Sequence, residues 1–251
     1  LSYNIDTLEV LDYRNPSDFN NGNCTDHEGR IIRCQHGLRR VIREEKNGEI
    51  TVIADNYNDK KLNSPNDVAV SKLGNIWFTD PPYGILTNQE GHKSESEQDG
   101  NNLFMVDKDF KIKKINAKFD KPNGLAFSPN GKYLYVADSG AANPGNFDLS
   151  RPHNIQVFEL DDDENIISNK IFAEINDGFP DGMTVDVNGN LFVCDPNGKK
   201  IHIFESSSNY IGNINIPERV ANCTFGGENK TDLYITASTS LFRIKTLTQG
   251  L

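Results

Sequence analysis

The sequence predicts an all-β protein made of repeated units, and two observations support this prediction. A short motif recurs along the chain, each time as a leading Asn or Asp, an apolar strand, a turn that contains Gly and a second apolar strand. No segment shows sustained helical periodicity. The chain has 251 residues, of which 36% are hydrophobic and 25% are charged, so it can bury a core. We therefore expect residues 1–251 to form one domain.

The repeat is clearest in three copies, which span Asn66–Asp80, Asn123–Asp138 and Asp181–Asp195, and weaker copies begin at Asn21 and Asn222. The leading positions 21, 66, 123, 181 and 222 are separated by 45, 57, 58 and 41 residues, which are the lengths of four-stranded propeller blades. Four copies also place a glycine eight residues after the leading residue, where a tight hairpin turn demands a positive φ: Gly29, Gly74, Gly131 and Gly189.

The segments between these motifs supply the outer strands of each predicted blade. They are short runs rich in Ile, Val and Phe, which are residues that favour strands. The predicted outer strands are Arg40–Arg43, Ile50–Ala54, Asn102–Val106, Ile112–Ile115, Ile155–Leu160, Lys170–Ala173, Lys200–Phe204 and Tyr210–Ile214. Two long polar stretches, 84–101 and 139–153, are predicted to be loops.

The number of strands indicates that one blade is incomplete. The five motifs supply five inner hairpins, whereas Leu1–Ile5 and Thr7–Tyr13 resemble the outer half of a further blade whose inner hairpin is not in the sequence. Because a missing hairpin leaves unpaired strand edges, we predict a six-bladed β-propeller of four-stranded antiparallel blades whose first blade is incomplete, with roughly 40 to 50 residues missing at the front. The alternatives are a five-bladed closure and a natural protein that tolerates the gap.

The composition excludes several classes of partner. The formal net charge of -10 would repel a phosphate backbone, so nucleic acid is not expected. No apolar run approaches the roughly 18 residues that span a membrane, and the N-terminal residues lack the pattern of a signal peptide. The four cysteines have no metal-binding spacing and are interpreted as buried thiols in a reducing, cytoplasmic compartment, although a disulfide between Cys24 and Cys34 stays open.

The leading residues of the repeats are candidate metal ligands. The inner strands of a propeller line its channel, so side chains at one repeat position converge near the axis. Asn66, Asn123 and Asp181 would bring hard oxygen donors together, and these donors suit calcium or magnesium rather than zinc. The alternative is structural, because Asn or Asp followed by Gly is common in Asx turns.

Several motifs stand in register along the chain: Leu62-Asn-Ser-Pro-Asn-Asp-Val68, Trp77-Phe-Thr-Asp-Pro-Pro-Tyr-Gly84, Lys121-Pro-Asn-Gly-Leu-Ala-Phe-Ser128, Pro180-Asp-Gly-Met183 and Ala237-Ser-Thr-Ser-Leu241. Together they resemble the gluconolactonase branch of the family that includes senescence marker protein, also called regucalcin. The resemblance runs from about residue 7 to the end of the chain.

That resemblance implies a six-bladed propeller with one divalent cation, commonly calcium, at the top of the channel. The ligands in the family pattern are two Asn, one Asp and a Glu from the first blade. The first three match Asn66, Asn123 and Asp181, whereas the Glu belongs to the inner strand that this sequence does not contain. A site with three protein ligands in place of four should bind the metal more weakly.

The implied activity is the metal-dependent hydrolysis of a sugar lactone, similar to gluconolactone, to the aldonic acid. Asp181 and His36 are the predicted catalytic residues, with Asp181 binding the metal and accepting a proton from the attacking water. The predicted substrate contacts are Asn21, Asp67, Tyr83 and His92. Asp67 is also expected to hold the neighbouring Asn66 in place.

Two other functions stay open at this point. The same metal could serve the hydrolysis of another ester or a phosphoester, because substrate choice is made by loops. A non-catalytic propeller that binds a small ligand or a protein is the second alternative, since fold does not dictate function. The absent Glu favours this second alternative if the chain is complete.

Overall fold

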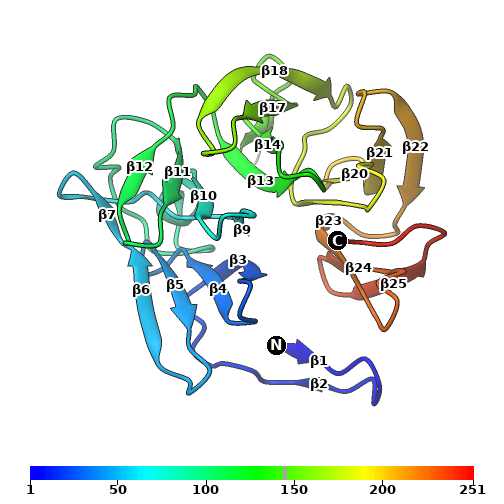
Figure 1. The fold of residues 1–251 in the computed structure, drawn as a ribbon, viewed down its shortest axis with the longest axis horizontal. Helices are drawn as coiled ribbons and strands as arrows, with labels where there is room; N and C mark the ends of the chain where they lie inside the picture. Colours follow the sequence, from blue (N-terminus) through cyan, green and yellow to red (C-terminus); the bar gives the residue numbers. More distant parts are fainter. Residues whose placement is uncertain (144–145) are drawn as a thin grey trace.

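The computed structural model describes residues 1–143 and 146–251 and confirms an all-β propeller arrangement. Figure 1 shows the sheets arranged in a ring around a common centre, with one strand of each sheet nearest to that centre. The one helix of the described residues, α1 (Tyr83–Leu86), is a single turn.

Four of the sheets are antiparallel meanders of four strands. Blade 1 contains β3 (Asn20–Thr25), β4 (Ile31–Gln35), β5 (Arg40–Glu44) and β6 (Ile50–Ala54). Blade 2 contains β9 (Val68–Val70), β10 (Ile76–Asp80), β11 (Asn102–Val106) and β12 (Ile112–Lys114). Blade 3 contains β13 (Pro122–Phe127), β14 (Tyr133–Asp138), β17 (Asn154–Leu160) and β18 (Ile166–Glu174). Blade 4 contains β19 (Met183–Val185), β20 (Leu191–Asp195), β21 (Lys200–Phe204) and β22 (Tyr210–Asn215).

The remaining strands form smaller sheets. Blade 5 has three strands, which are β23 (Val220–Gly226), β24 (Asp232–Ala237) and β25 (Leu241–Lys245). The two-stranded ribbons pair β1 (Ser2–Tyr3) with β2 (Val10–Leu11), β7 (Asn56–Tyr57) with β8 (Lys60–Lys61), and β15 (Ala142–Asn143) with β16 (Asn146–Phe147).

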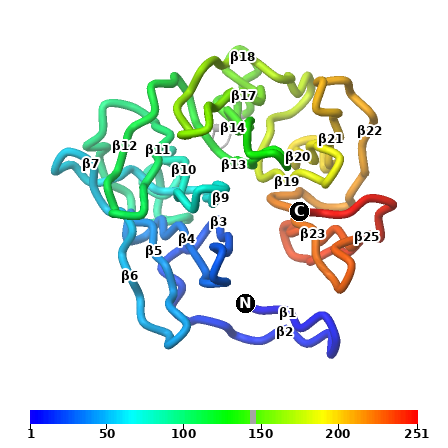
Figure 2. Tube along the Cα trace, viewed as in Figure 1, coloured from blue at the N-terminus to red at the C-terminus, as the bar shows by residue number. Residues whose placement is uncertain are grey.

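The prediction of six blades is wrong for this chain, because the described residues form five. The two segments expected to be the outer half of a further blade pair over only two residues each, as β1 and β2, since no inner hairpin lies beside them to extend the sheet. This ribbon lies between blade 5 and blade 1 (Figure 1 and Figure 2). The ring of Tyr3 contacts that of Tyr234 at 6.4 Å, and Tyr13 donates a hydrogen bond of 2.9 Å to Glu44.

The predicted hairpin turns are confirmed, because the four turn glycines all have φ values between 73° and 84°. The outer strand predicted to start at Lys170 begins earlier, at Ile166, because it pairs along the whole of β17. The two predicted loops contain more structure than expected. The loop 84–101 starts inside α1, and 139–153 holds the ribbon β15–β16, although residues 144 and 145 lie outside the described part of the chain.

A buried apolar cluster joins each blade to the next one in sequence. Successive residues on a strand point to opposite faces of the sheet, so Trp77 and Phe78 belong to different clusters. The clusters contain Ile32, Val41, Phe78 and Phe104 between blades 1 and 2; Trp77, Leu103, Leu134 and Phe158 between blades 2 and 3; Tyr135, Ile155, Val193 and Phe204 between blades 3 and 4; and Phe192, Ile201, Leu233 and Ile235 between blades 4 and 5.

All four cysteines are free thiols, so the disulfide left open between Cys24 and Cys34 is not formed. Three of them are buried in the blade interfaces, namely Cys34, Cys194 and Cys223. Within the described residues, no helix combines the length and the apolar character needed to cross a membrane.

Candidate active site

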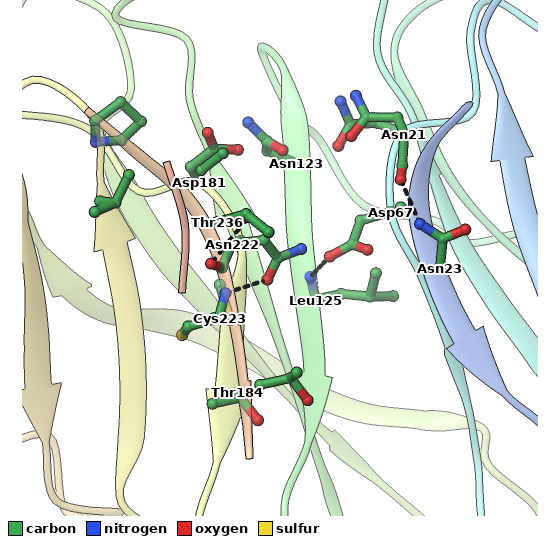
Figure 3. A pocket seen from close by; sticks show the side chains of 18 of the residues that line it. Asn21, Asn23, Asp67, Asn123, Leu125, Asp181, Thr184, Asn222, Cys223 and Thr236 are labelled. Atoms are coloured by element: carbon green, nitrogen blue, oxygen red, sulfur yellow. Dashed lines mark hydrogen bonds between the residues drawn. The ribbon is translucent and has the colours of Figure 1, made fainter. Parts of the chain in front are cut away.

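A cavity of about 1290 Å³ runs along the centre of the ring. Its wall includes residues from one strand of every blade, which are β3, β9, β13, β19 and β23. The leading residue of each sequence repeat lies on this wall: Asn21, Asn66, Asn123, Asp181 and Asn222. Figure 3 shows Asn123 and Asp181 side by side, with Asp67 and Asn222 lower in the same view. The structure therefore brings the three predicted metal ligands to one cavity.

An irregularity in strand pairing accompanies several of these leading residues. The register shifts between Asn20 and Asn23 in β3, between Pro122 and Leu125 in β13, and between Val220 and Asn222 in β23. A β-bulge turns a side chain away from the direction that the pleat would give it. The shared bulge therefore explains how one repeat position can present polar side chains to the cavity.

The glycine after a leading residue is required by the packing of the ring. A Cβ atom on Gly124 would lie 2.3 Å from the backbone oxygen of Asp181, and one on Gly182 would lie 2.2 Å from the Asn222 side chain. Backbone hydrogen bonds join the inner strands at the same level, since Gly182 N–H donates to the Ala221 carbonyl at 2.9 Å. These Asn-Gly and Asp-Gly pairs thus allow close approach of neighbouring blades, whereas the hairpin turns use a glycine further along the strand.

Three buried carboxylates brace the loops that lead into the inner strands of blades 2, 3 and 4. Asp80 accepts a hydrogen bond of 2.8 Å from Asn63 N–H, and Asp138 accepts two, from the N–H groups of Asp120 and Lys121 at 2.9 and 2.8 Å. Asp195 accepts one of 3.4 Å from Phe179 N–H. Each braced residue lies two or three positions before Asn66, Asn123 or Asp181. These three aspartates therefore fix the loops that precede the predicted metal ligands.

The electrostatics of the wall favour a bound cation. Burial, and then the charge of Asp67, raise the pKa of Asp181 to about 7, while hydrogen bonding to Asn123 opposes this effect. Burial also raises the pKa of Asp67 to about 6, although Val68 and Leu125 N–H groups donate hydrogen bonds to its carboxylate. Two neighbouring buried carboxyl groups are disfavoured as anions unless a positive charge joins them.

The donor set also fits a hard divalent cation. Asn66 is buried, and its side chain forms no hydrogen bond with any residue that the structure describes, so its amide oxygen is free to bind. No group of three or more His, Cys, Asp or Glu side chains in the described ranges could hold a metal ion by itself. A cation site here must therefore use amide oxygens together with Asp181, and such oxygen donors suit calcium or magnesium.

His36 lies behind Asn21 rather than on the cavity wall. Its Nδ1 is 3.0 Å from the Glu90 carbonyl oxygen, which can only accept, so Nδ1 carries the proton. Burial lowers the pKa of His36 to about 4, so the ring is neutral near pH 7 and its Nε2 accepts a hydrogen bond of 3.2 Å from Asn21 Nδ2. Because both ring nitrogens form hydrogen bonds, His36 connects Asn21 to Glu90 in the 84–101 loop.

The other predicted substrate contacts divide between two places. Asn21, Asp67 and Tyr83 line the cavity, and the buried Tyr83 hydroxyl has no hydrogen-bond partner among the described residues. His92 lies outside it, beside a separate pocket of about 410 Å³, with its ring 5.3 Å from that of Phe19. Sequence reasoning missed Arg219, which also lines the cavity. Its signal is positional, because it stands three residues before the leading Asn222, as Asn63 does before Asn66.

Comparison with known proteins gives consistent results. The family model for "SMP-30/Gluconolactonase/LRE-like region" matches residues 6–239. A gluconolactonase of Zymomonas mobilis is 35% identical over 95% of this chain and 65% of its own length. Human regucalcin is 28% identical over 77% of this chain and 60% of its own length. The solved gluconolactonase structure from Xanthomonas campestris has 33% identity and a TM-score of 0.80, covering 91% of this chain and 72% of that one. The chain thus spans less than two thirds of the length of these two curated relatives.

Proposed function

This chain belongs to the SMP-30/Gluconolactonase/LRE-like family, and from that premise we propose that it hydrolyses a sugar lactone of the gluconolactone type to the aldonic acid. The observation that carries the proposal is the placement of Asn66, Asn123 and Asp181 on one cavity wall. The names of the similar proteins support the reaction, since two of them are gluconolactonases.

Asn66, Asn123 and Asp181 would hold a divalent cation, which we propose to be calcium because the donors are hard oxygens. When bound, the cation supplies a Lewis acid that polarises the lactone carbonyl and stabilises the oxyanion. Asp181 is the group placed to accept a proton from the attacking water. The water oxygen bonds to the carbonyl carbon, the ring C–O bond breaks, and the ring oxygen takes up a proton to become a hydroxyl.

The remaining residues of the wall position these groups. Asp67 accepts hydrogen bonds from Val68 N–H of its own strand at 3.0 Å and Leu125 N–H of blade 3 at 3.3 Å, so it fixes the relative place of two inner strands. Asn21 and Tyr83 line the same cavity and can contact the substrate hydroxyls. His36 acts through Asn21, as a positioning residue. The free thiols support a reducing compartment such as the cytoplasm as the place of action.

The test is gluconolactone hydrolysis near neutral pH, corrected for the spontaneous reaction, with calcium and with excess chelator. We expect activity with calcium, its loss with chelator, and a loss of about a hundredfold or more in Asp181→Asn, which removes the carboxylate from both roles. Asn222→Ala changes the same repeat position in blade 5 and serves as the matched control. Equal rates with and without chelator, or unchanged activity in Asp181→Asn, would exclude this mechanism.

A further inference from the structure

The cavity wall carries acidic side chains and a single basic one among the described residues. The acidic lining residues are Asp67, Glu90 and Asp181, and the basic one is Arg219. The Arg219 guanidinium forms no hydrogen bond or ion pair with any described residue, and its side chain is exposed to the cavity. A permanent cation with five unused N–H donors is therefore presented to whatever enters.

The neighbouring acid, Glu218, does not form an ion pair with Arg219, because its carboxylate accepts hydrogen bonds from other residues. Glu218 accepts hydrogen bonds from Thr239 N–H at 2.8 Å and Thr239 Oγ1 at 3.1 Å, and from Ser240 Oγ at 2.5 Å. These contacts hold Glu218 against the turn between β24 and β25. The Arg219 carbonyl also accepts a hydrogen bond of 3.0 Å from Ser238 N–H, so the backbone that carries the guanidinium is fixed.

Arg219 is near the proposed reaction centre. Two residues after it, the Ala221 carbonyl accepts the hydrogen bond from Gly182 N–H, directly beside Asp181. Tyr83 lines the same cavity from blade 2, and its hydroxyl stays protonated because burial raises its pKa. A ligand between these elements would meet the Arg219 guanidinium beside Tyr83.

We propose that Arg219 binds a carboxylate on the substrate, so that this cavity prefers acidic sugar lactones, which carry a second carboxyl group, over neutral ones. The inference deepens the proposed lactone hydrolysis and rests on it. A guanidinium pairs with a carboxylate through two parallel N–H···O bonds, which makes the contact directional. Neutral hydroxyls need no such group, because the amides of Gln89 and Asn197 also line the wall. Arg219 is thus a specificity residue rather than a catalytic one.

The first test compares glucaro-1,4-lactone with glucono-1,4-lactone, which share a ring and differ in one carboxylate. In the calcium-loaded protein we expect a higher kcat/KM for the acidic lactone, and the ratio of the two values should fall about tenfold or more in Arg219→Gln. The loss should appear mainly in KM. Arg219→Lys should recover part of the ratio, and Lys46→Gln, which removes an exposed charge in the hairpin between β5 and β6, should leave it unchanged.

The second test measures binding without turnover, by calorimetric titration with glucarate and with gluconate. Tighter binding of glucarate that is lost in Arg219→Gln supports the inference even if neither lactone is hydrolysed, in which case only the proposed hydrolysis fails. Hydrolysis of both lactones with a ratio unchanged in Arg219→Gln overturns the inference and leaves the hydrolysis in place. Absence of both hydrolysis and glucarate binding overturns both.

Discussion

Blades 2, 3 and 4 differ from blades 1 and 5 in how they hold their channel-facing residues. In blades 2, 3 and 4, the second strand ends in an aspartate that braces the loop before the inner strand. Blade 1 has Gln35 at this position, and its side chain donates a hydrogen bond of 3.0 Å to Asp18. In this blade the carboxylate therefore belongs to the loop before the inner strand, and the amide belongs to the second strand. Blade 5 has Ala237, which offers no side-chain hydrogen bond. Only the braced blades carry the proposed metal ligands.

The same two groups of blades differ in how they meet their neighbours. Blades 2, 3 and 4 are enclosed by apolar clusters on both faces, whereas blades 1 and 5 each have one such cluster and one face toward the ribbon β1–β2. The contacts of the ribbon segment are aromatic and ionic, and Glu44 accepts from both Tyr13 and Arg14. Apolar packing on both faces and the proposed metal ligands are therefore found in the same three blades.

The largest expected effect on stability comes from disrupting an apolar cluster between two of the blades that carry a bracing aspartate. Phe158→Ala removes a fully buried ring from the cluster between blades 2 and 3, and should lower the free energy of unfolding by about 3 to 5 kcal/mol in a urea titration. Tyr133→Ala, an exposed residue on blade 3, should change it by about 0.5 kcal/mol or less. Similar decreases in the free energy of unfolding for both variants would show that the apolar cluster does not stabilise the contact between these blades.

Calcium should stabilise the braced blades next most strongly. A ligand at one hundred times its Kd raises the free energy of unfolding by about 2.7 kcal/mol, and the proposed site links blades 2, 3 and 4. Thermal unfolding with calcium and with chelator measures this difference. Asp181→Asn should abolish it, and Asn222→Ala should keep it. An Asp181→Asn variant that still responds to calcium would place the cation elsewhere.

The brace itself should give a pH dependence of stability. Burial raises the pKa of Asp80 to about 7, and its unfolded value is near 4, so the folded state binds the extra proton between these values. Its contribution to stability is present below about pH 4 and is lost as the pH rises through 7. Asp80→Asn should therefore lose less stability than the unchanged protein between pH 5 and 8, by on the order of 1 kcal/mol. Parallel pH profiles would mean that Asp80 ionises normally.

The smallest effect is expected at the ribbon. Tyr3→Ala removes the ring contact with Tyr234, and should cost about 0.5 kcal/mol because both groups lie at a partly exposed surface. Urea unfolding of this variant beside Phe158→Ala gives the comparison directly. A decrease in the free energy of unfolding equal to that of Phe158→Ala would show that the ribbon contact stabilises the fold as much as an apolar cluster between blades does.

The repeat made much of this architecture predictable. Asn66, Asn123 and Asp181 share one repeat position, and the turn glycines share another, so periodicity alone predicted that the first set faces one cavity and the second set forms the hairpin turns. Residues outside the repeat were harder, because a side chain that follows a strand has no fixed direction. His36 and His92 were expected near the substrate, yet His36 lies behind Asn21 and His92 lies outside the cavity.

Two further differences have a common physical origin. Arg219 is marked in the sequence only by its position three residues before Asn222, and it reaches the cavity because the ring brings blade 5 beside Asp181. The sixth blade was inferred by counting strands, although a strand forms only where a partner edge accepts it, and β1 and β2 find only each other. Both outcomes depend on contacts between distant parts of the chain, which sequence periodicity does not report.

Each bracing aspartate and the loop it holds lie within a single blade, no more than 18 residues apart. Duplication of one such repeat would copy the channel-facing residue together with the carboxylate that supports it. A copied blade 2, 3 or 4 would therefore carry its own support, whereas a copy of blade 5 would bring a polar residue without such an aspartate.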